Sequence, residues 1–206
     1  MNTEGLLAEV RQYYEASLAA HGATARGVDW KSAESQTLRF RQLGRLFADD
    51  PDGTILDFGC GYGALAAYLR QSGHAGAYVG FDLSERMVAE ATRTFALRDC
   101  RYTTELASLE PSDYVVASGV FNVKLRTPAA EWRLYLQETL RTMRSLARRG
   151  LAFNALTSYS DADRQRPDLY YADPLDLFDY CKRHISPSVA LLHDYPLHEF
   201  TILARL

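Results

Sequence analysis

One short stretch, residues 55–65 (ILDFGCGYGAL), constrains the fold of this chain more than any other. The apolar residues at its start predict a strand covered on both faces, and a helical pattern begins at Leu65. Between them, Gly59, Gly61 and Gly63 occupy alternate positions, where the missing Cβ lets the backbone turn tightly and approach a ligand closely. The stretch therefore predicts a strand, a ligand-binding glycine loop and a helix.

Two kinds of ligand suit such a loop. Gly59-x-Gly61-x-x-Ala64 satisfies the loose form of the dinucleotide fingerprint, in which a pyrophosphate lies at the helix N-terminus. Asp57, two residues before the first glycine, favours the other kind, because a carboxylate repels a phosphate and attracts an ammonium group. S-adenosylmethionine (SAM) carries an ammonium group and no phosphate, so it fits the second kind.

Two motifs in register carry a family resemblance. Residues 57–63 (DFGCGYG) resemble the first motif of the class I SAM-dependent methyltransferases, and residues 78–84 (YVGFDLS) resemble the second, a strand that ends in an acid. The resemblance implies that Asp82 binds the ribose diol and that Leu83 and Met87 flank the adenine. From the first motif it implies cofactor contacts by Asp57, Gly59, Cys60, Gly61 and Gly63.

The resemblance implies further cofactor contacts at the ends of the next two predicted strands. Glu105 and Leu106 occupy the place where the family has an acid and an apolar residue that read the adenine edge, although Asp99 is a rival acid. The strand predicted at residues 113–119 should end beside the sulfonium methyl. Ser118 would then contact the donor, and Asn122 would face both donor and acceptor.

The segment before the glycine loop predicts two helices. Apolar residues recur at helical spacing from Leu6 to Leu18, and Ser32 or Ser35 can cap a second helix. Ser84 can cap a further helix in the same way, after the second motif. In the family that the motifs resemble, such helices lie over the open ends of the strands. This placement makes Tyr14, Trp30, Gln36 and Arg39 candidates for contacts with the cofactor from the lid. Arg39 could then meet the carboxylate of the cofactor.

Later elements complete the predicted fold class. Pro128 opens a long helix that Gly150 closes, and residues 141–149 carry arginines on one solvated side of it. Strand-like runs at residues 188–192 and 200–206 predict an antiparallel hairpin. The expected fold is α/β: a doubly wound, mostly parallel seven-stranded sheet with a C-terminal hairpin. Residues 1–206 form one domain, with a helical cap over 1–50 and a Rossmann-like core over 51–206.

Two later segments supply further candidates for the chemistry. Residues 157–171 are irregular, polar and rich in tyrosine, as expected of a loop that lines an acceptor pocket, and Tyr171 is the candidate there. His193 could serve as a base if the terminal hairpin bends over the site. The candidate catalytic residues are Asn122, Tyr171 and His193.

Composition limits the possible partners. The net charge of −3 argues against an enzyme that is held on nucleic acid by phosphate contacts. Three scattered cysteines suggest neither a disulfide framework nor a zinc site, and no membrane span or signal peptide is expected. The expected location is the cytoplasm, and the expected state is a monomer or homodimer.

These observations lead to one functional expectation and two alternatives. The chain is expected to transfer the methyl group of SAM to an N or O atom of a small-molecule acceptor. The alternatives are an NAD(P)-dependent oxidoreductase that uses the glycine loop and a non-catalytic SAM-binding scaffold. The identity of the acceptor does not follow from the sequence.

Overall fold

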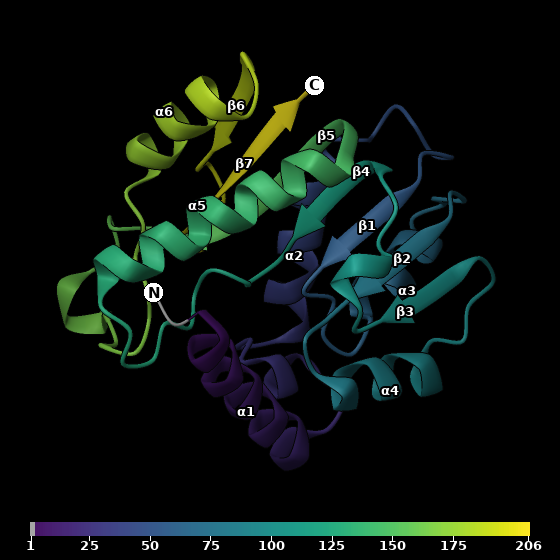
Figure 1. Ribbon diagram of the computed structural model, residues 1–206, viewed down its shortest axis with the longest axis horizontal. Coiled ribbons are helices and arrows are strands. Elements are labelled where there is room, and N and C mark those ends of the chain that lie inside the picture. The colour runs from purple at the N-terminus through teal and green to yellow at the C-terminus, as the bar shows by residue number, and fades with distance from the viewer. Residues whose placement is uncertain (1–2) are drawn as a thin grey trace.

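The computed structural model describes residues 3–206. The chain forms one sheet with helices on both faces (Figure 1). The strand order is β3-β2-β1-β4-β5-β7-β6, and only β7 runs antiparallel to its neighbours. The predicted fold class is therefore confirmed. The strands are β1 (Ile55–Phe58), β2 (Tyr78–Phe81), β3 (Cys100–Thr103), β4 (Ser112–Ala117), β5 (Ala147–Leu156), β6 (Ser188–Leu192) and β7 (Glu199–Arg205). The helices are α1 (Thr3–His21), α2 (Ala33–Gly44), α3 (Ala64–Gln71), α4 (Glu85–Thr94), α5 (Ala129–Leu146) and α6 (Pro174–His184).

Side-chain caps fix where several helices begin. The hydroxyl of Ser32 accepts a hydrogen bond from the Ser35 amide at the start of α2, and Ser84 accepts one from the Met87 amide at the start of α4. These caps satisfy amides that have no partner within the helix. Both helices begin where the sequence predicts. Within residues 3–206, no helix is long and apolar enough to cross a membrane.

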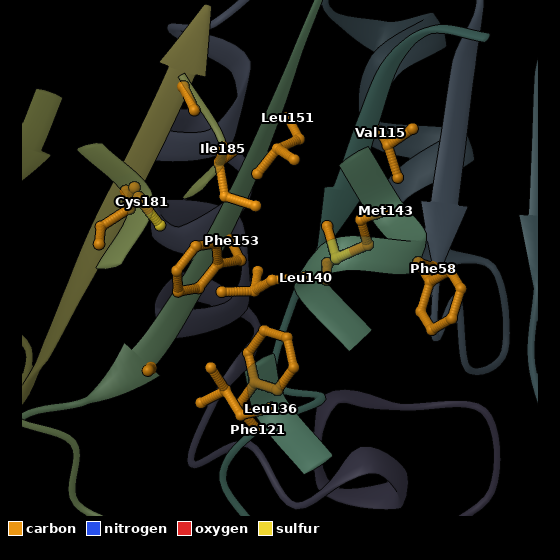
Figure 2. Close-up of a cluster of buried hydrophobic side chains, with 14 of the residues drawn as sticks. Phe58, Val115, Phe121, Leu136, Leu140, Met143, Leu151, Phe153, Cys181 and Ile185 are labelled. Atoms are coloured by element: carbon orange, nitrogen blue, oxygen red, sulfur yellow. The ribbon is translucent and has the colours of Figure 1, made fainter. Parts of the chain in front are cut away.

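The two faces of the sheet pack against different helices. Figure 2 shows Leu136, Leu140 and Met143 of α5 beside Val115 and Phe153 of the sheet, within the larger of the buried clusters. The opposite face packs against α2 and α3. Because side chains alternate along a strand, Asp57 of β1 and Glu199 of β7 project to the α2 side. This alternation places two carboxylates inside the protein.

The predicted end of the long helix is wrong. α5 ends at Leu146, and Gly150 lies inside β5, where it pairs with Tyr114 of β4 and Arg205 of β7. Arg148 and Arg149 therefore lie on a strand instead of on the helical face. Backbone pairing with two neighbouring strands satisfies the amides of this segment, and this long-range gain outweighs the local helical pattern.

A buried ion pair joins α2 to β7. The Arg39 guanidinium donates to both carboxylate oxygens of Glu199, with 2.7 Å from Nε to Oε2, and both side chains are almost fully buried. The same guanidinium lies 3.9 Å from the centre of the Trp30 ring, a cation–π contact. The pair thus fixes the loop before α2 to the sheet.

We predict that Glu199→Gln destabilises the fold by about 3 to 5 kcal/mol, because it leaves the buried charge of Arg39 uncompensated. Urea unfolding measures this change. Asp179→Asn, which breaks the exposed Arg183–Asp179 pair in α6, is the matched control and should leave the unfolding midpoint close to that of the wild type. Equal midpoints for the two variants would contradict the buried ion pair.

Candidate functional site

The glycine loop joins β1 to α3, and the amides of its glycines and of Cys60 donate to protein oxygens. The amides of Gly59 and Cys60 both donate to the carbonyl of Phe81, at 2.7 and 2.9 Å. The Gly63 amide donates to the Cys60 carbonyl at 3.0 Å. All three glycines of the loop have positive φ, between 53° and 85°, which favours glycine at these positions. These amides are therefore not free to bind an anion.

Asp82 follows β2 and ties the glycine loop to α4. One carboxylate oxygen accepts from the Gly61 amide and the other from the Ser84 amide, each at 2.9 Å. Burial raises the pKa of Asp82, although these two hydrogen bonds oppose the rise. A carboxylate oxygen has two lone pairs, so each oxygen retains capacity for a further donor.

Asp57 is the most unusual side chain of the site. It is buried, its Oδ2 accepts a hydrogen bond from the Tyr78 hydroxyl at 2.6 Å, and its Oδ1 has no partner among residues 3–206. Burial raises the pKa of Asp57 to about 7, although the Tyr78 hydroxyl opposes the rise. A buried oxygen without a partner is rare in folded proteins and marks a place where a ligand can supply the missing donor.

Two neighbouring hollows lie at the carboxyl ends of β1, β2 and β4. The larger, here called the cleft, encloses about 740 Å³ counted to its open mouth. The smaller, here called the inner hollow, encloses about 320 Å³ and is lined by Asp57, Cys60, Gln36 and Tyr62, among others. Both hollows are lined by Val28, Trp30, Gly59, Gly61 and Ser118, so the two spaces lie side by side. Figure 1 shows α1 lying near these strand ends.

Trp30 forms a wall between the two hollows. Arg39 packs against its ring, and Gly119 provides room for it, since a Cβ at Gly119 would lie 2.4 Å from the indole. Gly119 has a φ of +80° and donates its amide to the side-chain oxygen of Asn154. The wall is thus held from both sides by residues of the sheet and of α2.

Comparisons with known proteins agree with this geometry. A family model described as "Methyltransferase domain" matches residues 32–189. The putative methyltransferase Rv1506c of Mycobacterium tuberculosis is 50% identical over 153 residues, which cover 74% of this chain and 92% of that protein. The chain belongs to the methyltransferase family. This membership overturns the oxidoreductase alternative.

Solved structures share the fold of this methyltransferase at low sequence identity. A complex of DhpI with S-adenosylhomocysteine (SAH) has a TM-score of 0.69 at 18% identity, with 97% of this chain and 96% of that chain covered. The N-methyltransferase NodS of Bradyrhizobium japonicum WM9, also in complex with SAH, has a TM-score of 0.66 at 19% identity, with 95% and 96% covered. Both likenesses show the Rossmann-like fold of SAM-dependent methyltransferases.

The structure brings most of the predicted cofactor contacts together. The cleft is lined by Trp30, Gly59, Gly61, Asp82, Leu83, Met87 and Ser118. The inner hollow adds Asp57 and Cys60. Gly63 lies behind them as the N-cap of α3, where a Cβ would lie 3.0 Å from the ring of Tyr102. Its contribution is therefore to the packing of the loop.

Two predicted adenine contacts lie outside the lining of the two hollows. Glu105 and Leu106 follow β3 and are exposed, with 47% of Leu106 accessible. The rival acid Asp99 precedes β3 and pairs with Arg98 on the surface. It is therefore at the opposite end of the strand from the site, and Glu105 is the better placed of the two acids.

Four other predicted site residues are engaged elsewhere. Arg39 makes three hydrogen bonds, two to Glu199 and one to the Ser35 carbonyl, so a cofactor carboxylate would have to compete with an internal one. The Asn122 side-chain oxygen accepts from the Leu156 amide, which makes it a support of the strand end.

The remaining two candidates lie away from the cleft lining. The Tyr171 hydroxyl accepts from the Arg166 amide, within its own loop. His193 is exposed and stacks on Tyr159, with ring centres 5.9 Å apart, so the terminal hairpin does not bring it over the site. In the lining of the cleft, the structure places none of the three predicted catalytic residues.

The cleft includes residues that the sequence analysis missed. Tyr135 lines it from α5, and α1 contributes Leu7, Val10 and Arg11 beside the predicted lid residue Tyr14. The α1 residues follow helical spacing, so the amphipathic pattern carried a signal for one common face. Tyr135 carried no such signal, because a tyrosine on an amphipathic helix is more often part of the core.

We predict that Asp57→Asn stabilises the ligand-free protein at about pH 8, where the ionised carboxyl is buried without a full set of donors. Folding raises the pKa of Asp57 from 3.8 to about 7. Between these two values the folded state holds a proton that the unfolded state has lost, so the stability of the wild type falls as the pH rises from about 4 to about 7. The cost at the upper end is on the order of 4 kcal/mol. Urea unfolding at about pH 5 and about pH 8 should show a gap between variant and wild type that widens with pH. A constant gap would contradict the raised pKa.

Proposed function

We propose that this methyltransferase uses SAM as its donor and methylates an N or O atom of a small-molecule acceptor. The observation that carries the donor assignment is the unpartnered Oδ1 of Asp57 in the inner hollow. A buried carboxylate oxygen fits an ammonium donor, and the amino-acid part of SAM carries one. The SAH bound to DhpI and to NodS is consistent with this donor.

The glycine loop supports the same choice of ligand. A pyrophosphate needs free amide donors at the start of the helix, as in dinucleotide-binding loops. Here the amides of Gly59, Cys60, Gly61 and Gly63 already donate to protein oxygens. A phosphate would also lie close to two carboxylates, Asp57 and Asp82, which would repel it. The loop therefore suits a ligand without phosphate groups.

The chain's own residues would hold and orient the donor. Asp57 would accept from the ammonium group, and Asp82 would accept from the ribose hydroxyls. When bound, SAM supplies a methyl group on a sulfonium centre, which an acceptor lone pair takes in line. Trp30, Phe58, Phe81 and Val120 enclose this space with apolar surface. Alignment and exclusion of water are then the chain's main contributions to the rate.

The outer part of the cleft supports a small acceptor. α1 covers it with Leu7, Val10 and Tyr14, and the opposite wall includes Tyr135. Burial raises the pKa of Tyr14 and of Tyr135, so both phenols keep their protons at neutral pH. Neutral hydroxyl groups in an apolar wall can hydrogen-bond an N or O nucleophile and hold it toward the methyl group.

A cluster of charged residues fastens this cover. The Tyr13 hydroxyl of α1 donates to Asp29 at 2.8 Å, and Arg166 of the loop before α6 lies 3.7 Å from the same carboxylate. Arg166 also pairs with Asp168. The loop before α6 is thus joined to α1 and to the loop before α2, and these last two segments both line the cleft. A covered cleft of this kind favours a small molecule over a polymer as the acceptor.

We predict that the wild type binds SAH in isothermal titration calorimetry and does not bind NAD(H) or NADP(H). Asp57→Asn should weaken SAH binding by about tenfold or more, because the hydrogen bond that it removes is to a charged group. A screen of metabolite extracts with isotope-labelled SAM should yield SAH and a labelled product. Failure of the wild type to bind SAH, or binding that Asp57→Asn leaves unchanged, would contradict the proposed donor.

We predict that Asp82→Ala weakens SAH binding by about 1 to 3 kcal/mol. Because Asp82 also tethers the glycine loop, a 2′-deoxyribose analogue of SAH separates its two roles. The wild type should bind the analogue less tightly than SAH, whereas Asp82→Ala should bind the two alike. An equal preference for SAH in both proteins would remove Asp82 from the ribose role.

A further inference from the structure

A second polar side chain faces the inner hollow and has a free hydrogen-bonding group. Gln36 of α2 is 7% exposed and lines the hollow together with Asp57. Its side-chain oxygen accepts a hydrogen bond from the Tyr62 hydroxyl at 2.9 Å. Among residues 3–206, no hydrogen-bond acceptor lies against the Gln36 side-chain nitrogen. Two N–H donors are therefore available to a ligand.

Tyr62 determines which end of the amide faces the ligand. Burial raises the pKa of Tyr62, so its phenol keeps its proton and donates to the Gln36 oxygen. Tyr62 itself lies in the glycine loop, between Gly61 and Gly63, and packs near Leu18 and Met87. The glycine loop thus holds the oxygen end of the Gln36 amide, which leaves its nitrogen end for a ligand in the hollow that Gln36 lines.

The two sides of the inner hollow have complementary chemistry. Asp57 offers a buried acceptor that suits an ammonium group, and Gln36 offers neutral donors that suit a carboxylate. An α-amino acid carries both groups on one carbon. A neutral amide is compatible with Asp57, whereas an arginine in the same hollow would pair with Asp57 and occupy the ammonium position.

Arg39, which the sequence analysis expects to bind the carboxylate, is already paired with an internal carboxylate. Arg39 donates to Glu199 and to the Ser35 carbonyl, and its guanidinium packs against Trp30. It does not line either hollow. Its contribution to the site is to hold the Trp30 wall, which leaves the carboxylate position to another residue.

We propose that Gln36 binds the carboxylate of the donor's amino-acid part, with Tyr62 as a positioning residue that presents the amide. This inference rests on the proposed use of SAM and assigns one more of its contacts. It also predicts a specific preference: the protein should distinguish SAM from decarboxylated SAM, which keeps the ammonium and sulfonium groups but lacks the carboxylate. That preference should depend on Gln36 and not on Asp57.

Isothermal titration with SAM and with decarboxylated SAM tests the assignment. Gln36→Leu should weaken SAM binding by about tenfold or more and leave binding of decarboxylated SAM unchanged. Asp57→Asn should weaken both ligands, because both carry the ammonium group. Tyr62→Phe should weaken SAM alone, by less than Gln36→Leu, because the amide remains but is no longer oriented.

A matched control and a second variant complete the design. Gln42→Leu makes the same substitution on the same helix at a residue outside the hollow and should leave both affinities unchanged. Gln36→Glu should reverse the preference in favour of decarboxylated SAM, because a carboxylate repels a carboxylate. Thermal unfolding verifies that each variant is folded.

The outcomes separate this inference from the proposed function. Equal losses for the two ligands in Gln36→Leu, or no loss for SAM, would overturn the role of Gln36 even if the wild type binds SAM. A wild type that binds neither ligand would instead overturn the proposed donor. A preference that Gln36→Glu does not reverse would place the carboxylate elsewhere in the hollow.

Discussion

The site depends on a buried carboxyl group that the protein satisfies only in part. The Tyr78 hydroxyl binds one oxygen of Asp57, and the other oxygen lies without a partner in the inner hollow. Burying an ionised group in this way is unfavourable unless a cation or several donors accompany it. The arrangement is destabilising in the ligand-free protein and becomes favourable when a ligand brings an ammonium group.

The rest of the site is arranged around this carboxyl. Four amides of the glycine loop donate to protein oxygens and are therefore not available to an anion. Asp82 holds the loop against α4. The Arg39–Glu199 pair lies on the same face of the sheet as Asp57 and fixes Trp30 as the wall of the hollow. The carboxyl groups that select the ligand and the ion pair that holds its pocket thus come from different parts of the chain. The sheet brings these parts together.

The sequence predicts well where a signal is local. The glycine spacing, the acid at the end of β2 and the serine caps of α2 and α4 each occupy a few consecutive residues, and the structure has the expected elements there. It predicts poorly where a distant partner decides the outcome. Glu199 lies far along the chain from Arg39, and nothing near either residue indicates that they pair.

The remaining differences have the same physical origin. Gly150 is a residue type that favours the end of a helix, yet pairing with β4 and β7 places it inside a strand. His193 and Tyr171 have suitable chemistry, but the terminal hairpin and the loop before α6 direct them to other contacts. Residue type alone therefore identified candidates, and only the three-dimensional arrangement showed that Gln36, and not Arg39, faces the hollow.

The most direct test of the central claim is the proton balance of ligand binding. Calorimetric titration of SAH at about pH 6, in buffers of different ionisation enthalpy, measures the protons exchanged on binding. With a pKa of about 7 in the ligand-free protein, Asp57 is mostly protonated at that pH and must ionise to accept from the ammonium group. The account predicts release of nearly one proton by the wild type and none by Asp57→Asn. Binding of SAH without proton release, or equal release by the two proteins, would contradict it.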